Sequence, residues 1–168
     1  MASQSELLWW LIPGVLAGMR LPFIHPQRFE RRNLPLDSCE DDLPVLYAAG
    51  IRAVVSLLDT PSDVHVYSRT GFTFRCIPIH TGDAPSRAQT MQFVHFVNEQ
   101  RAQSKPVAVH CQGGLGRTGT LMAAYLIAGG DDTVTAIVRV RDAESKAIET
   151  ARQVEFLEQF ARFCRRWL

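Results

Sequence analysis

The residues best suited to chemistry lie together in one glycine-rich segment, HCQGGLGRTG, which runs from His110 to Gly119. A short apolar run at 106–109, which reads as a buried strand, leads into the segment, and a helical pattern follows it. Glycines let the backbone curl until successive N–H groups point inward and form a nest for an anion. The positive end of the following helix is directed at the same point. The segment therefore predicts an anion-binding loop between a strand and a helix.

Three side chains in this segment predict more than anion binding. Cys111 opens what we call the anion loop (residues 111–117), where electropositive surroundings favour a thiolate over a thiol. Arg117 can close the loop with a bidentate fork that fits two oxygens of a phosphate group. Thr118 can donate its hydroxyl to the sulfur, which stabilises the thiolate and makes it a better leaving group. The sequence predicts a loop that binds a phosphate ester as a dianion and presents a nucleophile to it.

The segment resembles the His-Cys-x5-Arg-[Ser/Thr] signature of protein tyrosine and dual-specificity phosphatases. At ordinary residue frequencies a chance match in a chain of this length is on the order of one in a million. Further segments are similar, in the same order, to small atypical dual-specificity phosphatases: WLIPGVLAGMRLP, VVSLL, IPIHTGDAPS and AIETARQ. Kinase-associated phosphatases are similar around GGLGR. The resemblance extends over residues 9–165.

The resemblance implies a role for each matching position. Cys111 would be the nucleophile, Arg117 the phosphate clamp, His110 a group that tunes the cysteine, and Thr118 an aid to the departure of the phosphocysteine. The interior of the loop would bind phosphate through Gln112, Gly113, Gly114, Leu115 and Gly116. No metal or organic cofactor is expected, because the nest and the guanidinium already supply positive charge.

Two further positions match residues that place water for the second chemical step. The family often has two glutamines there, and this chain has Glu149 and Gln153. Gln153 matches that pattern, whereas Glu149 departs from it. A glutamate could act as a base instead, and small atypical members share the substitution.

The proton donor for the leaving group is less well determined. Such a donor is usually an aspartate on a mobile loop. The position that the family commonly uses, four residues before the loop's proline, is Thr81, and the position after the Ile-Pro pair is Ile79. We expect a shifted loop in which Asp83 protonates the leaving group, with His80 and Asp59 as reserve candidates. The alternative is that Asp83 only caps the following helix.

The expected substrate is a phosphoprotein. The interior of the anion loop carries no lysine or histidine, whereas phosphoinositide and polyphosphate phosphatases often place extra basic residues there. No segment resembles the long tyrosine-recognition loop of classical tyrosine phosphatases, which predicts a shallow pocket. Phosphotyrosine is therefore expected, with phosphoserine and phosphothreonine as further substrates.

Rival site classes explain fewer of these residues. Gly114, Gly116 and Gly119, with Asp142 downstream, fit a dinucleotide fingerprint. The remaining chain lacks the strands that such a fold needs, and this reading gives Cys111 no purpose. A nucleotide-binding phosphate loop would need a lysine. A sulfurtransferase, an arsenate reductase or a binding module without turnover stays open as an alternative.

Composition limits the setting of the chain. Its 168 residues predict one domain, residues 1–168, with 46% hydrophobic and 21% charged residues. A net charge of +1 favours neither nucleic acid nor an anionic membrane as a partner. Four scattered cysteines without metal-ligand spacing predict a reduced, cytoplasmic setting and no metal site. We expect a monomer. A disulfide between Cys76 and Cys111 is the less favoured reading of Cys76.

Periodicity and turn residues predict the elements around the loop. The apolar segment at 7–19 is too short to span a bilayer and lacks a preceding basic residue, so we expect a buried strand or turn. Strands are expected at 51–58, 72–79 and 106–110, and helices at 40–49, 86–103, 118–128 and 149–168. Residues 132–141 are ambiguous because their valines alternate as in a strand. The predicted fold is α/β, with a four- to five-stranded, mostly parallel sheet flanked by helices.

Overall fold

A five-stranded sheet forms the centre of the computed structural model, which describes residues 3–31, 34–59 and 64–167. The strand order is β1-β2-β5-β3-β4, and every neighbouring pair is parallel except β1 with β2. The strands are β1 (Leu8–Ile12), β2 (Leu16–Met19), β3 (Ala53–Ser56), β4 (Thr73–Cys76) and β5 (Val107–His110). The predicted α/β class and the predicted four- to five-stranded, mostly parallel sheet are confirmed.

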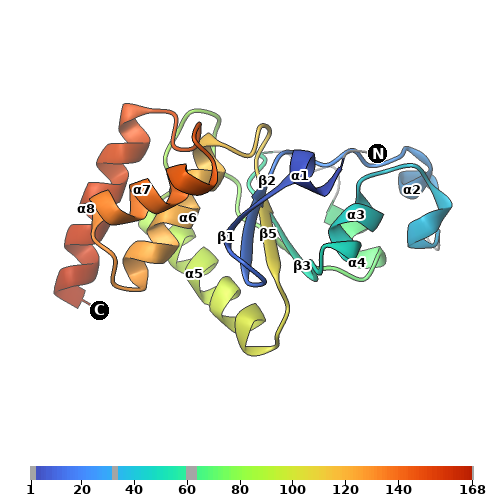
Figure 1. Ribbon diagram of the computed structural model, residues 1–168, viewed down its shortest axis with the longest axis horizontal. Helices are drawn as coiled ribbons and strands as arrows, with labels where there is room; N and C mark the ends of the chain where they lie inside the picture. Colours follow the sequence, from blue (N-terminus) through green and yellow to red (C-terminus); the bar gives the residue numbers. More distant parts are fainter. Residues whose placement is uncertain (1–2, 32–33, 60–63, 168) are drawn as a thin grey trace.

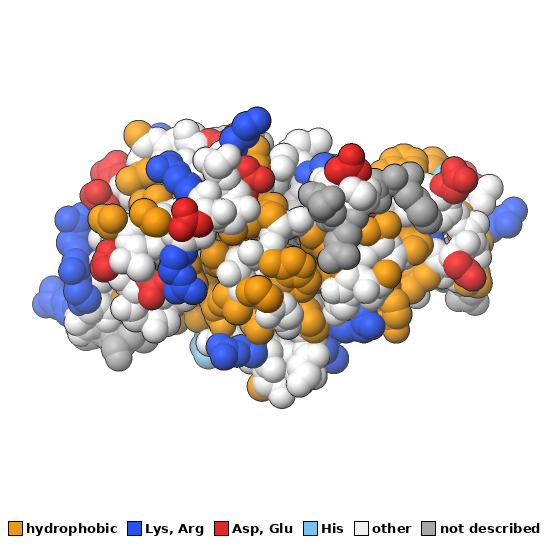
Figure 2. All heavy atoms as spheres, in the orientation of Figure 1, with side chains coloured by type: hydrophobic (Ala, Val, Ile, Leu, Met, Phe, Trp, Pro, Cys, Tyr) orange, Lys and Arg blue, Asp and Glu red, His pale blue; other side chains and the backbone are white. Residues whose placement is uncertain are grey.

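Helices cover both faces of the sheet, and the longer ones gather on one side (Figure 1). This side holds α5 (Arg87–Ala102), α6 (Gly116–Ala128), α7 (Thr133–Ala143) and α8 (Ala151–Trp167). The other side holds α3 (Leu43–Ala48) and α4 (Val64–Arg69), followed outward by α2 (Gln27–Glu30) and a 3-10 turn at Leu36–Ser38. A short α1 (Gln4–Leu7) precedes the sheet. Figure 2 shows the molecule in the orientation of Figure 1. Hydrophobic side chains gather in the middle of the surface that it shows, in the region of the β1–β2 hairpin.

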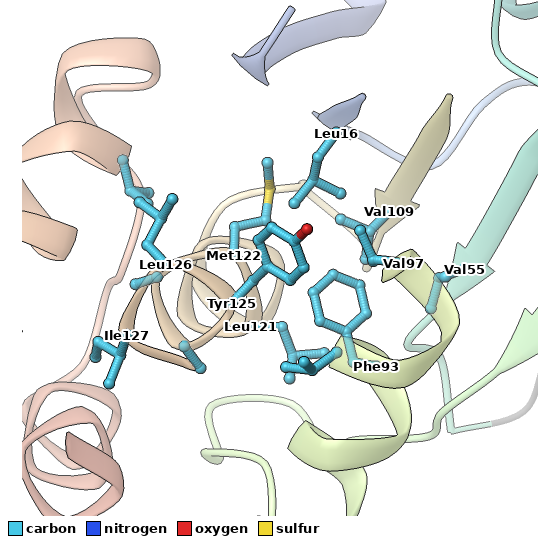
Figure 3. Close-up of a cluster of buried hydrophobic side chains, with 14 of the residues drawn as sticks. Leu16, Val55, Phe93, Val97, Val109, Leu121, Met122, Tyr125, Leu126 and Ile127 are labelled. Carbon is cyan, nitrogen blue, oxygen red and sulfur yellow. The ribbon is translucent and has the colours of Figure 1, made fainter. Parts of the chain in front are cut away.

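The larger hydrophobic core lies between the sheet and the longer helices (Figure 3). Phe93 and Val97 of α5 meet Leu121 and Met122 of α6, next to Val109 of β5. All of β5 is buried, and α6 is buried on nearly every side because it lies among the sheet, α5, α7 and α8. This packing holds fixed the two elements that the anion loop connects.

The four predicted helices form, and their ends differ from the expected bounds by up to three residues. The helix expected from Ser86 forms as α5, and Ser86 caps it in a capping box with Gln89. The helix expected at 118–128 begins at Gly116, two residues earlier. Arg117 therefore lies inside the first turn of α6, where helix geometry fixes the direction of its side chain.

The ambiguous segment 132–141 is a helix, α7. The side chain of Asp132 caps its start by accepting a hydrogen bond from the Thr135 backbone N–H, at 3.0 Å. The alternating valines mislead because Val134 and Val138 are 72% and 51% exposed, whereas Ala136, between them, is buried. The segment at 7–19, expected as a strand or turn, forms the β1–β2 hairpin, and α4 was not predicted.

Candidate active site

The anion loop joins the carboxyl end of β5 to the first turn of α6. Gly114 has a φ of +75°, and any side chain there would overlap the backbone of Met19 at the end of β2. Position 114 therefore favours glycine for two independent reasons: its backbone is left-handed, and a side chain would overlap the backbone of Met19. The loop is seated directly on the sheet.

Cys111 lies at the bottom of this loop and is 3% exposed. The Thr118 hydroxyl donates a hydrogen bond to its Sγ, at 3.3 Å. Burial by itself raises the pKa of Cys111, but hydrogen bonds from Thr118 and from the Gly114 N–H, together with the charge of Arg117, outweigh burial. The net pKa of Cys111 lies below the ordinary value for cysteine, which favours the nucleophilic thiolate.

Arg117 is held by the ends of two other strands. Its Nη1 donates to the carbonyl oxygen of Ile79 at 2.8 Å and to that of Leu57 at 3.4 Å. These carbonyls follow β4 and β3, so the guanidinium is fixed at the carboxyl edge of the sheet, beside the end of β5. The side chain is 6% exposed, and within the described ranges its Nε and Nη2 make no hydrogen bond to protein. Those donors suit an oxyanion.

His110 supports the loop from behind. Its Nδ1 lies 3.2 Å from the Cys111 carbonyl oxygen, and a carbonyl only accepts, so Nδ1 carries the proton. Nε2 then accepts from the hydroxyl of Tyr67, at 3.3 Å. Tyr67 belongs to α4 and stacks on Phe74, with ring centroids 5.2 Å apart. His110 is fully buried and contacts the cysteine through its backbone.

Glu149 and Gln153 both lie against the anion loop. A side chain at Gly116 would overlap the carboxylate of Glu149 and would come within 3.0 Å of Gln153 Nε2. Gln153 Oε1 accepts from the Glu149 N–H at 2.8 Å, which ties the two positions together. The structure thus brings both side chains against Gly116 of the anion loop.

The loop that carries Asp83 contacts both Arg117 and Gln153. Arg117 holds the carbonyl of Ile79 at its start, and Gln153 Nε2 donates to the carbonyl of Asp83, at 3.3 Å. The Asp83 carboxylate forms an ion pair with Arg152 of α8. Ser86 caps α5, so helix capping, the alternative reading of Asp83, is wrong.

The two reserve candidates for the proton donor form a pair with each other. His80 Nδ1 lies 3.0 Å from an Asp59 carboxylate oxygen, and the His80 side chain is 79% exposed. Each of the two is close in sequence to a carbonyl that holds Arg117. The pair therefore lies near Arg117.

The sheet register separates Cys76 from the anion loop. Ser56 of β3 lies opposite Cys76 on one side and opposite His110 on the other. Two strand spacings are about 10 Å, whereas a disulfide requires Cα atoms less than about 7 Å apart. A Cys76–Cys111 disulfide would therefore need backbone movement. Within residues 3–31, 34–59 and 64–167, no group of three His, Cys, Asp or Glu side chains is arranged to hold a metal ion.

Three residues near the site were missed by sequence reasoning: Trp9, Tyr67 and Arg152. Each reaches the site from an element remote in sequence, and none belongs to the signature segment. The sequence held one partial signal, and it concerned Trp9. Side chains alternate along a strand, so Trp9 and Trp10 are expected to point to opposite faces of the sheet.

Known proteins resemble the chain in both sequence and fold. A family model described as "Polymorphic toxin system, DSP-PTPase phosphatase" matches residues 32–131, more than half of the chain. Dual specificity protein phosphatase CDC14AB of Danio rerio is 32% identical over 118 residues, 70% of this chain but 18% of the relative. This chain thus spans about a fifth of the length of that relative.

Two further similarities cover nearly all of this chain. Phosphatidylglycerophosphate phosphatase PTPMT2 of Arabidopsis thaliana is 29% identical over 166 residues, 95% of this chain and 65% of the relative. The crystal structure of Tk-PTP in the active form superposes with a TM-score of 0.71 at 27% identity, covering 92% of this chain and 96% of that one. The chain belongs to the dual-specificity protein tyrosine phosphatase (DSP-PTPase) family.

Proposed function

We propose that the chain hydrolyses phosphate monoesters on proteins through a phosphocysteine intermediate. The observation that carries this proposal is the arrangement of Cys111, Thr118 and Arg117: a cysteine of lowered pKa, a hydroxyl on its sulfur and a fixed guanidinium beside it. Together they stabilise negative charge on the nucleophile and on the group that it attacks. The chain would act as a single unit, residues 1–168.

In the first step, the loop N–H groups and Arg117 hold the phosphate dianion. The Cys111 thiolate attacks the phosphorus in line, so that the P–S bond forms while the bond to the ester oxygen breaks. The departing oxygen takes a proton from Asp83, whose backbone lies over the loop through Gln153.

In the second step, Glu149 and Gln153 orient a water molecule toward the phosphorus. The water oxygen forms the new P–O bond, and its proton passes to the carboxylate that was left ionised in the first step. The sulfur leaves as a thiolate, which the Thr118 hydroxyl stabilises. Free phosphate and the starting enzyme result. The loop and Arg117 supply the positive charge, so the proposed reaction uses no metal or cofactor.

The substrate that we propose is phosphotyrosine in a protein, with phosphoserine and phosphothreonine also accepted. Gln112 and Gly113 are exposed in the loop itself, which supports a shallow site open to more than one side chain. CDC14AB carries a protein phosphatase name. We propose a monomer that works in a reducing compartment such as the cytoplasm. No disulfide joins the four cysteines, all of which lie in the described ranges. Within those ranges, no helix is long and apolar enough to cross a membrane.

A phospholipid substrate is the second candidate. The relative named for phosphatidylglycerophosphate matches 95% of this chain, a larger share than the 70% matched by CDC14AB. Against it, the interior of the anion loop offers no basic side chain for a second phosphate or a polar headgroup.

Matched substrates test the two candidates directly. Phosphotyrosine and phosphothreonine peptides of one sequence, phosphatidylglycerophosphate in mixed micelles and a phosphoinositide are compared by phosphate release. We expect the highest kcat/KM with the phosphotyrosine peptide and at least about tenfold lower values with both lipids, equivalent to about 1.4 kcal/mol in transition-state binding. A lipid preference of similar size would contradict the protein assignment but would leave the phosphocysteine chemistry in place.

Asp83 is tested by replacement with asparagine, which keeps its shape but removes the proton. We expect turnover of substrates with poor leaving groups to fall by about 10²–10⁴-fold and the basic limb of the pH–rate profile to flatten. An aryl ester whose leaving group needs no proton should be affected less. His80→Gln and Asp59→Asn are the matched controls, and a larger loss in either would transfer the role to the His80–Asp59 pair.

A further inference from the structure

Two carbonyl groups of the anion loop are held from outside by the N-terminal part of the chain. The Leu21 N–H donates to the Gln112 carbonyl at 2.9 Å, just beyond β2. The indole Nε1 of Trp9 donates to the Gly114 carbonyl at 3.2 Å, across 105 residues of sequence. Residues 9–21 lie outside the part of the chain, 32–131, that matches the family model.

Trp9 reaches the loop because Gly18 makes room for it. The two residues are partners across the antiparallel β1–β2 pair, and a side chain at Gly18 would overlap the indole ring. The ring therefore lies over β2 and extends to the loop on its far side. Trp9 packs against the core shared with α6, whereas Trp10 packs against the core on the other face. Only one of the two neighbouring tryptophans contacts the loop in this way.

The hydrogen bond from Trp9 sets the direction of one peptide group. In a planar trans peptide the C=O and the N–H point in opposite directions. Fixing the Gly114 carbonyl toward Trp9 therefore turns the N–H of Leu115, which shares that peptide group, away from Trp9 and toward the loop interior. The N–H of Gly114 itself contributes to lowering the pKa of the Cys111 thiol. One peptide group then serves the phosphate and its neighbour serves the thiolate.

We propose that Trp9 is a positioning residue for the phosphate group: its indole N–H fixes the Gly114–Leu115 peptide so that the Leu115 N–H binds a phosphate oxygen. This inference rests on the proposed function, because it names one part of the same anion site. Trp9 does not touch the substrate. Its effect should appear in the affinity for tetrahedral and trigonal-bipyramidal oxyanions.

The test replaces Trp9 with phenylalanine, which keeps an aromatic ring over Gly18 but removes the N–H donor. Inhibition constants for orthovanadate and inorganic phosphate are measured against p-nitrophenyl phosphate, with kcat and KM for the same ester. We expect both inhibition constants to rise by about three- to tenfold, the effect of one lost hydrogen bond between neutral groups, and kcat/KM to fall similarly. Trp10→Phe is the matched control, and it should bind both anions as the parent does.

A second variant separates the N–H from the ring. Benzothienylalanine at position 9 keeps the two-ring shape and replaces the N–H with sulfur, so it serves even if Trp9→Phe folds poorly. It should show the same three- to tenfold weakening. Parent-like affinity in this variant, or an equal loss in Trp10→Phe, overturns the role of Trp9 alone. A parent protein that binds neither anion overturns the proposed function, and the role of Trp9 with it.

Discussion

Replacing Cys111 with serine is expected to abolish hydrolysis of phosphate esters, with a loss of about 10⁵-fold or more. A serine hydroxyl stays protonated at neutral pH and is a far weaker nucleophile than a thiolate, and the hydrogen bond from Thr118 would be directed at its oxygen. Initial rates with p-nitrophenyl phosphate measure the loss. Phosphate binding should persist, because Arg117 and the loop N–H groups remain. A serine variant that hydrolyses esters at the parental rate would contradict the phosphocysteine mechanism.

The thiolate itself can be observed through its pH dependence. Iodoacetamide alkylates the thiolate, whose fraction rises with pH through the pKa, so a lowered pKa moves the whole reaction curve to lower pH. Cys111 should therefore react with a midpoint at lower pH than an ordinary cysteine does, because its pKa is lowered. Cys164 is the internal control, because burial raises its pKa and should delay its reaction.

The geometry of the anion loop was predictable because its causes are local. Glycines, the end of a strand and the start of a helix stand next to one another in sequence, and the nest follows from them. The hydrogen bond between Thr118 and Cys111 spans only seven residues. The elements with strong periodicity or a capping box, such as α5, were predictable for the same reason.

The parts that could not be predicted depend on contacts between distant segments. The partners of Tyr67, Arg152 and Trp9 lie 43, 69 and 105 residues away. No pattern within a single element indicates such a contact, because it arises only once the sheet order is set. The alternating valines of α7 show the opposite error, since a local pattern indicated a strand while packing against α6 selected a helix.

The candidate proton donor could be predicted only in part. The sequence indicated Asp83 as a candidate but could not say what its carboxylate contacts. The ion pair with Arg152 means that the side chain must exchange one partner for another before it can reach a leaving group. Because Arg152 is 72% exposed, water competes for the pair and the exchange is inexpensive. The loop can therefore hold Asp83 near the site without locking it there.

Arg117 is the second residue whose replacement should nearly eliminate activity. We expect Arg117→Ala to lower kcat/KM by about 10³–10⁵-fold, the range found when an arginine that stabilises a transferring phosphoryl group is removed. Alanine deletes the charge next to the thiolate, and it also removes the donor that holds the Ile79 and Leu57 carbonyls.

Arg117→Lys separates these contributions, because lysine keeps the charge but loses the planar fork. If the role of Arg117 is bidentate binding of two phosphate oxygens, lysine should recover no more than about tenfold of the lost kcat/KM. If charge alone matters, lysine should recover most of it, and the proposed clamp would be wrong. Arg139→Lys, in a surface ion pair with Asp131, should leave kcat/KM unchanged. The comparison is informative because Arg117 Nη1 already donates to backbone carbonyls. The donors left for phosphate are Nε and Nη2, and a single ammonium group cannot replace both and also hold the carbonyls.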